Sequence, residues 1–201
     1  MSKGKPIGSV PCGHRAWFPS AGRCGGWFVL CGLLCLAGHP TRGADAEVRK
    51  EYQVKAAFLY NFTKFVEWPQ ARFANDTSPI VIGVLGRNPF GDELAKIVNG
   101  RTVNGHPILV KLIATADEVP AVHLLFVPAG EENRLLPAAW QSAAIVVVGE
   151  SGAFATLGGT ITFTREADKV RFAINLATAE RAGLKISAQL LKLATAVHRK
   201  P

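Results

Sequence analysis

Apolar and polar residues alternate along this chain in two ways, one typical of helices and one of buried strands. In residues 51–69 (EYQVKAAFLYNFTKFVEWP) apolar side chains recur at steps of three and four, which is the spacing of one helix face. We expect the inward stripe of this helix to be Val54, Phe58, Phe62 and Phe65. Trp68 precedes Pro69, and because a residue before proline avoids the α region, the helix should end there.

Downstream of this helix, apolar runs indicate strands that are buried on both faces. The segments 80–86 (IVIGVLG), 122–127 (VHLLFV) and 144–148 (AIVVV) are nearly continuous and rich in β-branched residues. Between the first two lies a helical segment, with Asn88 suited to the N-cap and Pro89 to the first helical position. This alternation predicts right-handed crossovers and a mainly parallel sheet covered by helices.

The last third of the chain predicts a different local arrangement. Residues 160–164 and 170–175 alternate apolar with polar positions around a short turn, which indicates an antiparallel hairpin at the edge of the sheet. Ser187 should cap a C-terminal helix over residues 188–199. The expected fold class is therefore a single-domain α/β protein with a mainly parallel sheet, an edge hairpin and a C-terminal helix.

Residues 1–46 have the features of a signal peptide and leader. A basic, acid-free lead-in precedes an apolar run at residues 27–37, which is too short to span a bilayer comfortably. Ala44 and Ala46 then provide the small side chains that a signal peptidase requires. We expect cleavage near Ala46 and a periplasmic α/β domain over residues 47–201, with an uncleaved N-terminal anchor as the alternative.

The leader accounts for all the cysteine and half of the net charge. All four cysteines (Cys12, Cys24, Cys31, Cys35) precede residue 47, so the mature chain has no thiol or disulfide chemistry. From residue 47 onward nine Lys and nine Arg face four Asp and ten Glu, which gives 18 − 14 = +4 against +8 for the whole chain. These cations are scattered, so no nucleic-acid surface is expected.

Residues 51–69 also suggest an interaction surface. Six aromatic residues in this segment are more than one core face normally takes. We therefore expect a dimer or partner surface made of Tyr52, Leu59, Tyr60 and Trp68. The alternative, that the helix only covers the sheet, stays open.

A ligand crevice is expected where the predicted parallel strands end, because ligands of open α/β sheets bind beyond the carboxyl ends of the strands. The candidate residues there are Arg87, Asn88, Phe90 and Glu150. The loop at residues 86–91 lacks the Lys-Ser/Thr of a phosphate loop, since Asp92 and Glu93 stand in its place.

No catalytic residue, metal ligand or cofactor is predicted. The three histidines of the mature chain have no metal-site spacing, and Ser151 lacks the G-x-S-x-G elbow of a serine nucleophile. The sequence therefore favours a non-enzymatic protein.

The motifs along the mature chain resemble one family, the YfiR-like exported bacterial proteins. The resemblance runs from about residue 52 to residue 197 and rests on residues 52–62 (YQVKAAFLYNF), 65–69 (FVEWP), 82–86 (IGVLG), 88–91 (NPFG), 103–108 (VNGHPI), 148–150 (VGE), 158–163 (GGTITF), 170–175 (VRFAIN) and 182–187 (AGLKIS).

This resemblance implies a periplasmic α/β domain that is often a homodimer. The best-understood type restrains a membrane-bound diguanylate cyclase by binding its periplasmic domain, which lowers cyclic-di-GMP. Disulfides matter in that type, but the mature chain has no cysteine, so redox control does not carry over. Our leading hypothesis is a regulator that binds a membrane protein's periplasmic domain, and the alternative is a small-molecule sensor.

Overall fold

The core of the fold is an eight-stranded mixed sheet. The computed structural model describes residues 41–134 and 143–199, and the strand order is β10-β8-β7-β6-β5-β2-β4-β3. The strands of this sheet are β2 (Ile80–Leu85), β3 (Thr102–Val103), β4 (His106–Ile113), β5 (Leu124–Val127), β6 (Val146–Gly149), β7 (Ile161–Glu166), β8 (Lys169–Asn175) and β10 (Ala196–His198). Two further short strands, β1 (Val66–Glu67) and β9 (Lys185–Ile186), pair antiparallel with each other.

The centre of the sheet is parallel, as the continuous apolar runs predict. Strands β4, β2, β5, β6 and β7 run in one direction, with Ile82 of β2 paired to Val110 and to Leu124. All four residues of β5 and of β6 are buried. The chain moves from β2 to β4 on one side and then to β5 on the other, so the strand order reverses around β2.

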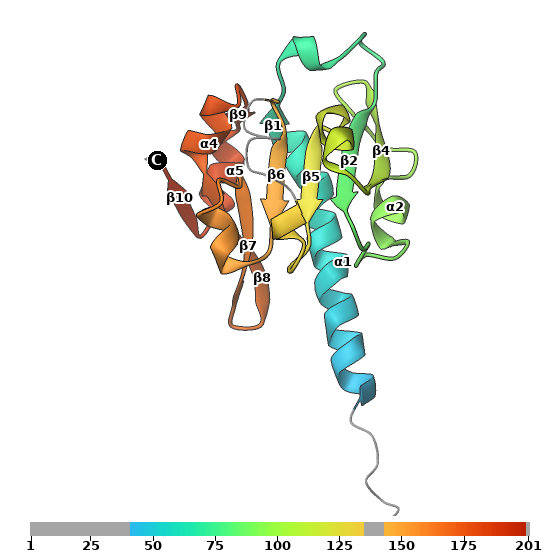
Figure 1. Cartoon of the computed structure of the whole chain (residues 1–201), viewed down its shortest axis with the longest axis vertical. Helices are drawn as coiled ribbons and strands as arrows, with labels where there is room; N and C mark the ends of the chain where they lie inside the picture. The colour runs from blue at the N-terminus through green and yellow to red at the C-terminus, as the bar shows by residue number, and fades with distance from the viewer. Residues whose placement is uncertain (1–40, 135–142, 200–201) are drawn as a thin grey trace, which may run out of the picture. The chain divides into compact units, whose positions relative to one another are not determined.

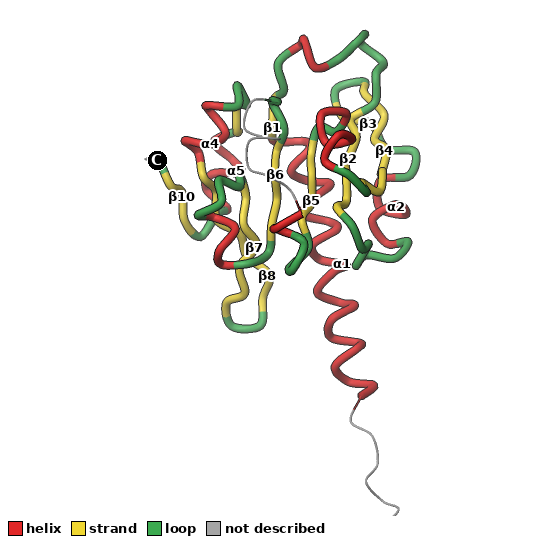
Figure 2. Tube along the Cα trace, viewed as in Figure 1, coloured by secondary structure: helices red, strands yellow, loops and turns green. Residues whose placement is uncertain are grey.

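Helices of the described chain cover one face of this sheet. They are α1 (Thr41–Phe65), α2 (Glu93–Val98), α4 (Leu176–Arg181) and α5 (Ala188–Leu193). Each contributes buried residues to one core cluster together with the strands. The other face carries a smaller cluster, to which the 3-10 turns η2 (Ala116–Ala121) and η4 (Gly152–Ala155) contribute Val119 and Phe154. Figure 2 shows the helices beside the strands.

Helix α1 crosses the sheet and continues beyond the carboxyl ends of the parallel strands (Figure 1). Its buried stripe is Ala56, Leu59 and Phe62, followed by Val66 of β1. Phe62 confirms the predicted core, and Phe58 and Phe65 pack against it as partly buried residues. Val54 was expected in the core but is 39% exposed, because the buried stripe of Ala56, Leu59 and Phe62 lies on a different face of the helix.

The fold class is confirmed, and three predicted boundaries are corrected. Helix α1 ends at Phe65, since Val66 and Glu67 pair with β9 before Pro69 is reached. The β7-β8 hairpin exists, but β10 pairs with β8 on its outer side, so the hairpin is not the edge of the sheet. The C-terminal helix α5 ends at Leu193, and Val197 lies in β10.

Two further observations concern the start of the domain. None of the helices among residues 41–134 and 143–199 is long and apolar enough to cross a membrane. The predicted cleavage point near Ala46 falls inside α1.

Candidate functional site

A buried carboxylate lies where the sequence predicts a ligand crevice. Glu150 follows β6 directly, and its side chain is only 5% exposed. One carboxylate oxygen, Oε1, accepts hydrogen bonds from the Tyr52 hydroxyl and from the backbone N–H of Ala129, each at 2.9 Å. Ala129 follows the carboxyl end of the neighbouring strand β5, so Glu150 joins two strand ends to α1.

Lys55 of α1 is the counter-ion of Glu150. Its side chain is 7% exposed, and its ammonium lies 2.5 Å from Glu150 Oε2 and 2.6 Å from Glu51 Oε1. Burial of an ammonium group is costly unless it is paired and hydrogen-bonded, and here two carboxylates supply the pairing. Lys55, Glu51 and Glu150 therefore form a charged contact that fixes α1 against the sheet.

Tyr52 adds a neutral donor to the same contact. Burial raises the pKa of the Tyr52 hydroxyl well above its usual range, and the negative charge of Glu150 raises this pKa further. The hydroxyl is therefore protonated at any physiological pH and donates to the carboxylate. The Tyr52 ring also packs edge-to-face on Phe90, with centroids 5.5 Å apart.

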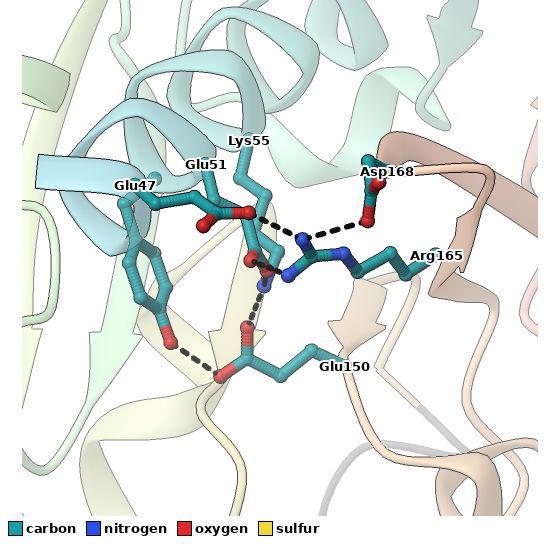
Figure 3. A network of polar contacts seen from close by, with 7 residues as sticks. Glu47, Glu51, Lys55, Glu150, Arg165 and Asp168 are labelled. Atoms are coloured by element: carbon teal, nitrogen blue, oxygen red, sulfur yellow. Dashed lines mark hydrogen bonds and ion pairs between the residues drawn. The ribbon is translucent and has the colours of Figure 1, made fainter. Parts of the chain in front are cut away.

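A second group of ion pairs joins α1 to the β7-β8 hairpin, and Figure 3 shows both groups side by side. Arg165 lies 2.6 Å from Glu47, 3.4 Å from Glu51 and 3.1 Å from Asp168. The hydrogen bond to Glu47 is the main cause that raises the pKa of Arg165. Because Arg165 is half exposed, water screens these pairs, and we expect them to orient the helix more than to stabilise the fold.

This network divides α1 into two parts. The inner half (residues 55–65) carries the buried stripe, and the outer half (residues 45–54) carries the acids that contact Lys55 and Arg165. Residues 45–50 are all exposed, and Val48 is an apolar side chain among them at 52% exposure. The network has no free nucleophile or unpaired acid. Its role is therefore structural: it holds the outer half of α1 in place.

The aromatic surface predicted from the sequence is only partly available. Leu59 was expected on a partner surface, but it is fully buried, because it lies in the same stripe as Ala56 and Phe62. Tyr52, Tyr60 and Trp68 are half-buried and pack against the core. The side chain of Tyr60 is contacted by Lys64 and Arg101, both with a cation 4.9 Å from its ring centre.

Trp68 contacts a second buried titratable group, His123. This residue directly precedes β5, so it lies at the amino end of that strand, whereas Glu150 follows the carboxyl end of β6. The indole N–H of Trp68 donates to the carbonyl oxygen of His123, and the two rings meet edge-to-face. His123 Nδ1 accepts from the N–H of Val81, and its ring stacks on Phe73 at 4.8 Å. Burial lowers the pKa of His123 to about 4, and the nearby Arg72 charge lowers it further. The ring is therefore neutral at pH 7.

The predicted crevice residues are not all brought together. Arg87, Asn88 and Phe90 line a groove of about 670 Å³ beside α1, but Glu150 does not line it. Asn88 does not cap α2, which begins at Glu93. It accepts from the N–H of Phe90 and donates to the carbonyl of Gly91, so it closes the loop before the helix.

Sequence reasoning missed the residues that hold α1 in place. Glu47, Lys55, Arg165 and Asp168 were not candidates, and Glu51 entered only as the start of the helix. The one local signal was the Glu51–Lys55 pair, whose spacing of four residues suits a helix. In the part of the chain that the structure describes, no cluster of three or more His, Cys, Asp or Glu could hold a metal ion.

Comparisons with known proteins place the chain in a family. Two solved structures resemble it weakly: an ABC domain in complex with L-Trp from Streptococcus pneumonia (15% identity, TM-score 0.46) and a conserved domain protein from Vibrio cholerae (11% identity, TM-score 0.46). In each case the similarity covers 73% of this chain and only 60% of the other. No curated protein sequence matches the chain. The family model described as YfiR/HmsC-like matches residues 52–195, and the chain belongs to that family.

Proposed function

We propose that this protein is a periplasmic regulator that restrains a membrane-bound signalling enzyme, a diguanylate cyclase, by binding its periplasmic domain. Membership of the YfiR/HmsC-like family supports this class of function. The observation that carries the proposal is the outer half of α1, which extends beyond the sheet (Figure 1) and exposes residues 47–50, which cleavage near Ala46 would retain.

The outer half has the properties of a binding surface. Val48 places an apolar side chain among exposed polar ones, so it can serve as a contact that a partner desolvates. The helix is also pre-organised, since the buried Lys55–Glu150 pair and the Arg165 contacts hold it before a partner arrives. Pre-organisation lowers the entropy cost of association.

The deletion phenotype tests this function. A strain that lacks the protein should show raised cyclic-di-GMP and stronger surface attachment, and expression of the unaltered chain should reverse both. Cyclic-di-GMP measured in cell extracts is the readout. Unchanged levels in the deletion strain would contradict the proposal.

The assembly and the location are parts of the same proposal. We expect an exported protein, cleaved near Ala46, that forms a homodimer and works without disulfides because residues 47–201 contain no cysteine. Fractionation of cells and sedimentation velocity of the purified protein test these expectations. A protein found only in the cytoplasm could not meet a periplasmic domain.

A second candidate function is small-molecule sensing at the groove of Arg87, Asn88 and Phe90. This groove lies at the carboxyl end of β2, where the strand order reverses and α/β sheets commonly bind ligands. A ligand that binds the folded state should raise the melting temperature, and Arg87→Ala should reduce that rise. Flat melting curves across a metabolite library would count against it.

A further inference from the structure

Strand β4 leaves one edge of the main sheet open, because β3 covers only its beginning. β3 pairs with residues 106–107 alone, and the N–H of Ile108 donates to the carbonyl of Arg101. Over residues 109–113, which we call the open stretch, β4 pairs only with β2 among the described residues. Figure 2 shows β3 and β4 at the right side of the sheet. An open edge of this kind is a template for another strand.

The unpaired backbone groups of the open stretch belong to Val110 and Leu112. Successive residues of a strand direct their N–H and C=O groups to alternate sides, and the carbonyl of Ile113 accepts from the N–H of Gly86 on the β2 side. The odd-numbered residues of the stretch therefore bond to β2, and the even-numbered ones point outward. Among residues 41–134 and 143–199, the N–H and C=O of Val110 and Leu112 have no hydrogen-bond partner.

The open stretch also exposes two large apolar side chains. Leu109 is 52% exposed and Leu112 is 56% exposed, and they project from opposite faces of the strand. Large apolar side chains with this much exposure are few in the described chain: Val48, Val54, Leu109, Leu112 and Leu193. A strand placed along this edge would bond to the free backbone groups and cover both leucines.

We propose that the homodimer forms through this edge, with the β4 strands of two copies antiparallel across a two-fold axis at Lys111. The inference rests on the homodimer of the proposed function and names its surface. In this register Val110 lies opposite Leu112 of the partner subunit, and the two residues exchange both of their N–H···O=C bonds. The outward groups of both residues are then bonded in each copy.

The ends of the open stretch favour this register over its neighbours. An axis at Val110 would place Ile113 of one copy opposite Pro107 of the other, where Thr102 of β3 already pairs. An axis one residue after the proposed one would pair Val110 with Ala114, whose N–H already donates within its own chain. The proposed axis aligns the open stretch with itself and ends before β3, so a second copy of β4 fits this edge.

Lys111 should weaken this pairing without preventing it. Its side chain would lie directly opposite the same lysine of the other copy, and like charges in that position are destabilising. The ammonium of Lys111 lies 2.8 Å from Glu118 of its own chain, which offsets part of this repulsion. A lysine on an edge strand also discourages open-ended aggregation. We therefore expect a closed and reversible dimer.

The dimer edge is separate from the outer half of α1. Strand β4 pairs with β2, whereas the outer half contacts Glu150 and the β7-β8 hairpin. Each copy keeps its own outer half, so loss of the dimer should leave the partner surface of a single copy intact. Sedimentation therefore tests the dimer edge, and cyclic-di-GMP tests the restraint of the cyclase, independently of each other.

Sedimentation velocity of the purified protein over a range of concentrations tests the dimer edge. Leu112→Pro removes an outward N–H but none that bonds to β2, and it should raise the dissociation constant of the dimer at least about tenfold. Ala196→Pro is the matched control. It removes an outward N–H on β10, where Thr195 bonds inward, and should leave the dimer unchanged. Far-UV circular dichroism checks the fold of both variants.

The outcomes separate the dimer from its surface. A protein that stays monomeric at every concentration would overturn both the homodimer and this edge. A dimer that Leu112→Pro leaves unchanged, or that both proline variants weaken equally, would overturn the edge alone.

Lys111→Thr tests the axis in the opposite direction. It removes the repulsion at the axis and should lower the dissociation constant by up to about fivefold. Lys96→Thr, which also removes a lysine paired with a glutamate, is the control and should change nothing. Amide exchange of the unaltered protein, measured by NMR, should be slower at Val110 and Leu112 in concentrated than in dilute solution. An unchanged or weaker dimer in Lys111→Thr, or exchange that does not depend on concentration, would contradict the axis.

Discussion

The two halves of α1 belong to one helix but are held by different forces. The inner half packs Ala56, Leu59 and Phe62 into the core with no exposed surface. The outer half has exposed side chains at residues 45–50. It is held by the hydrogen bond from Tyr52 to Glu150 and by ion pairs of Glu51 with Lys55 and of Glu47 with Arg165. Apolar burial is not directional, whereas paired charges require a particular geometry. The inner half therefore stabilises the domain, and the outer half is the part of the helix that we propose binds a partner.

This difference predicts how each half responds to change. Loss of volume in the inner half leaves a cavity and lowers the free energy of unfolding. A change at an exposed position of the outer half should leave the fold intact and alter what the helix can bind. If the proposed function is right, variants in the two halves should separate stability from binding.

Phe62→Ala should show the largest effect on stability. Phe62 is fully buried between Phe58, Phe163 and Phe172, with ring centres 5.1–6.0 Å away. Its truncation should lower the free energy of unfolding by about 3–5 kcal/mol. Val54→Ala in the outer half should change it by less than about 0.5 kcal/mol. Urea unfolding measures both, and similar losses would remove the distinction between the halves.

Lys55→Met tests the junction of the two halves. The variant leaves Glu150 buried without its counter-ion, so the free energy of unfolding should fall by about 3–5 kcal/mol. In Lys55→Met with Glu150→Gln, an amide can still accept from Tyr52 and Ala129, and most of the stability should return. Urea unfolding of the single and double variants measures the coupling. A double variant no more stable than Lys55→Met alone would show that the charges are not coupled.

Acid should lower the free energy of unfolding through His123, whose carbonyl accepts from Trp68 just after the inner half. The pKa of His123 is about 4 when folded against 6.5 ordinarily, so the unfolded state binds more protons between these values. Stability is then fully present above pH 6.5 and is lost as the pH falls toward 4. By pH 5 the loss should be about 2 kcal/mol relative to pH 7.5.

Urea unfolding at pH 7.5 and pH 5.0 measures this loss, with His123→Asn as the comparison. Asparagine can accept from the N–H of Val81 but does not titrate. The charges of Arg72 and His106 also lower the pKa of His123. The variant therefore isolates the part of the acid effect that comes from protonation of His123. The same acid loss in His123→Asn would assign the effect to other groups.

Arg165→Gln should have the smallest effect on stability and a visible effect on the outer half. Its ion pairs with Glu47, Glu51 and Asp168 are solvent-exposed, so the free energy of unfolding should fall by less than about 1 kcal/mol. Hydrogen exchange in residues 45–54 should accelerate, because the helix loses its contact with the hairpin. Lys96→Gln, which removes an ion pair on α2, is the control and should not change exchange in α1. Unchanged exchange in Arg165→Gln would contradict a tethering role.

Much of the fold could be predicted because its signals are local. Strands β5 and β6 are buried on both faces, and their sequences are continuous apolar runs. In the β7-β8 hairpin, apolar and polar residues alternate along each strand. The end of the C-terminal helix could not be predicted from periodicity. Residues 194–198 leave the helix to pair with β8, and Thr195 donates its N–H to the carbonyl of Phe172. That partner is distant in sequence.

The candidate site was harder to predict for the same reason. Lys55 looks like a polar flank of the helix, and it is buried only because Glu150, 95 residues away, supplies its counter-ion. Two apolar residues of α1 were predicted wrongly in opposite directions: Leu59, expected on a partner surface, fills the core, and Val54, expected in the core, is exposed. Periodicity predicts that this segment is a helix, but the contact with the sheet decides which face of the helix is buried.

A complementation experiment tests whether the outer half of α1 is needed for regulation. In a strain that lacks the protein, Val48→Glu should fail to lower cyclic-di-GMP, although it accumulates and folds like the unaltered chain. Leu112→Glu is the matched control, since Leu112 is 56% exposed against 52% for Val48 and lies on β4. We expect full complementation by Leu112→Glu and none by Val48→Glu. Full complementation by Val48→Glu would contradict this expectation.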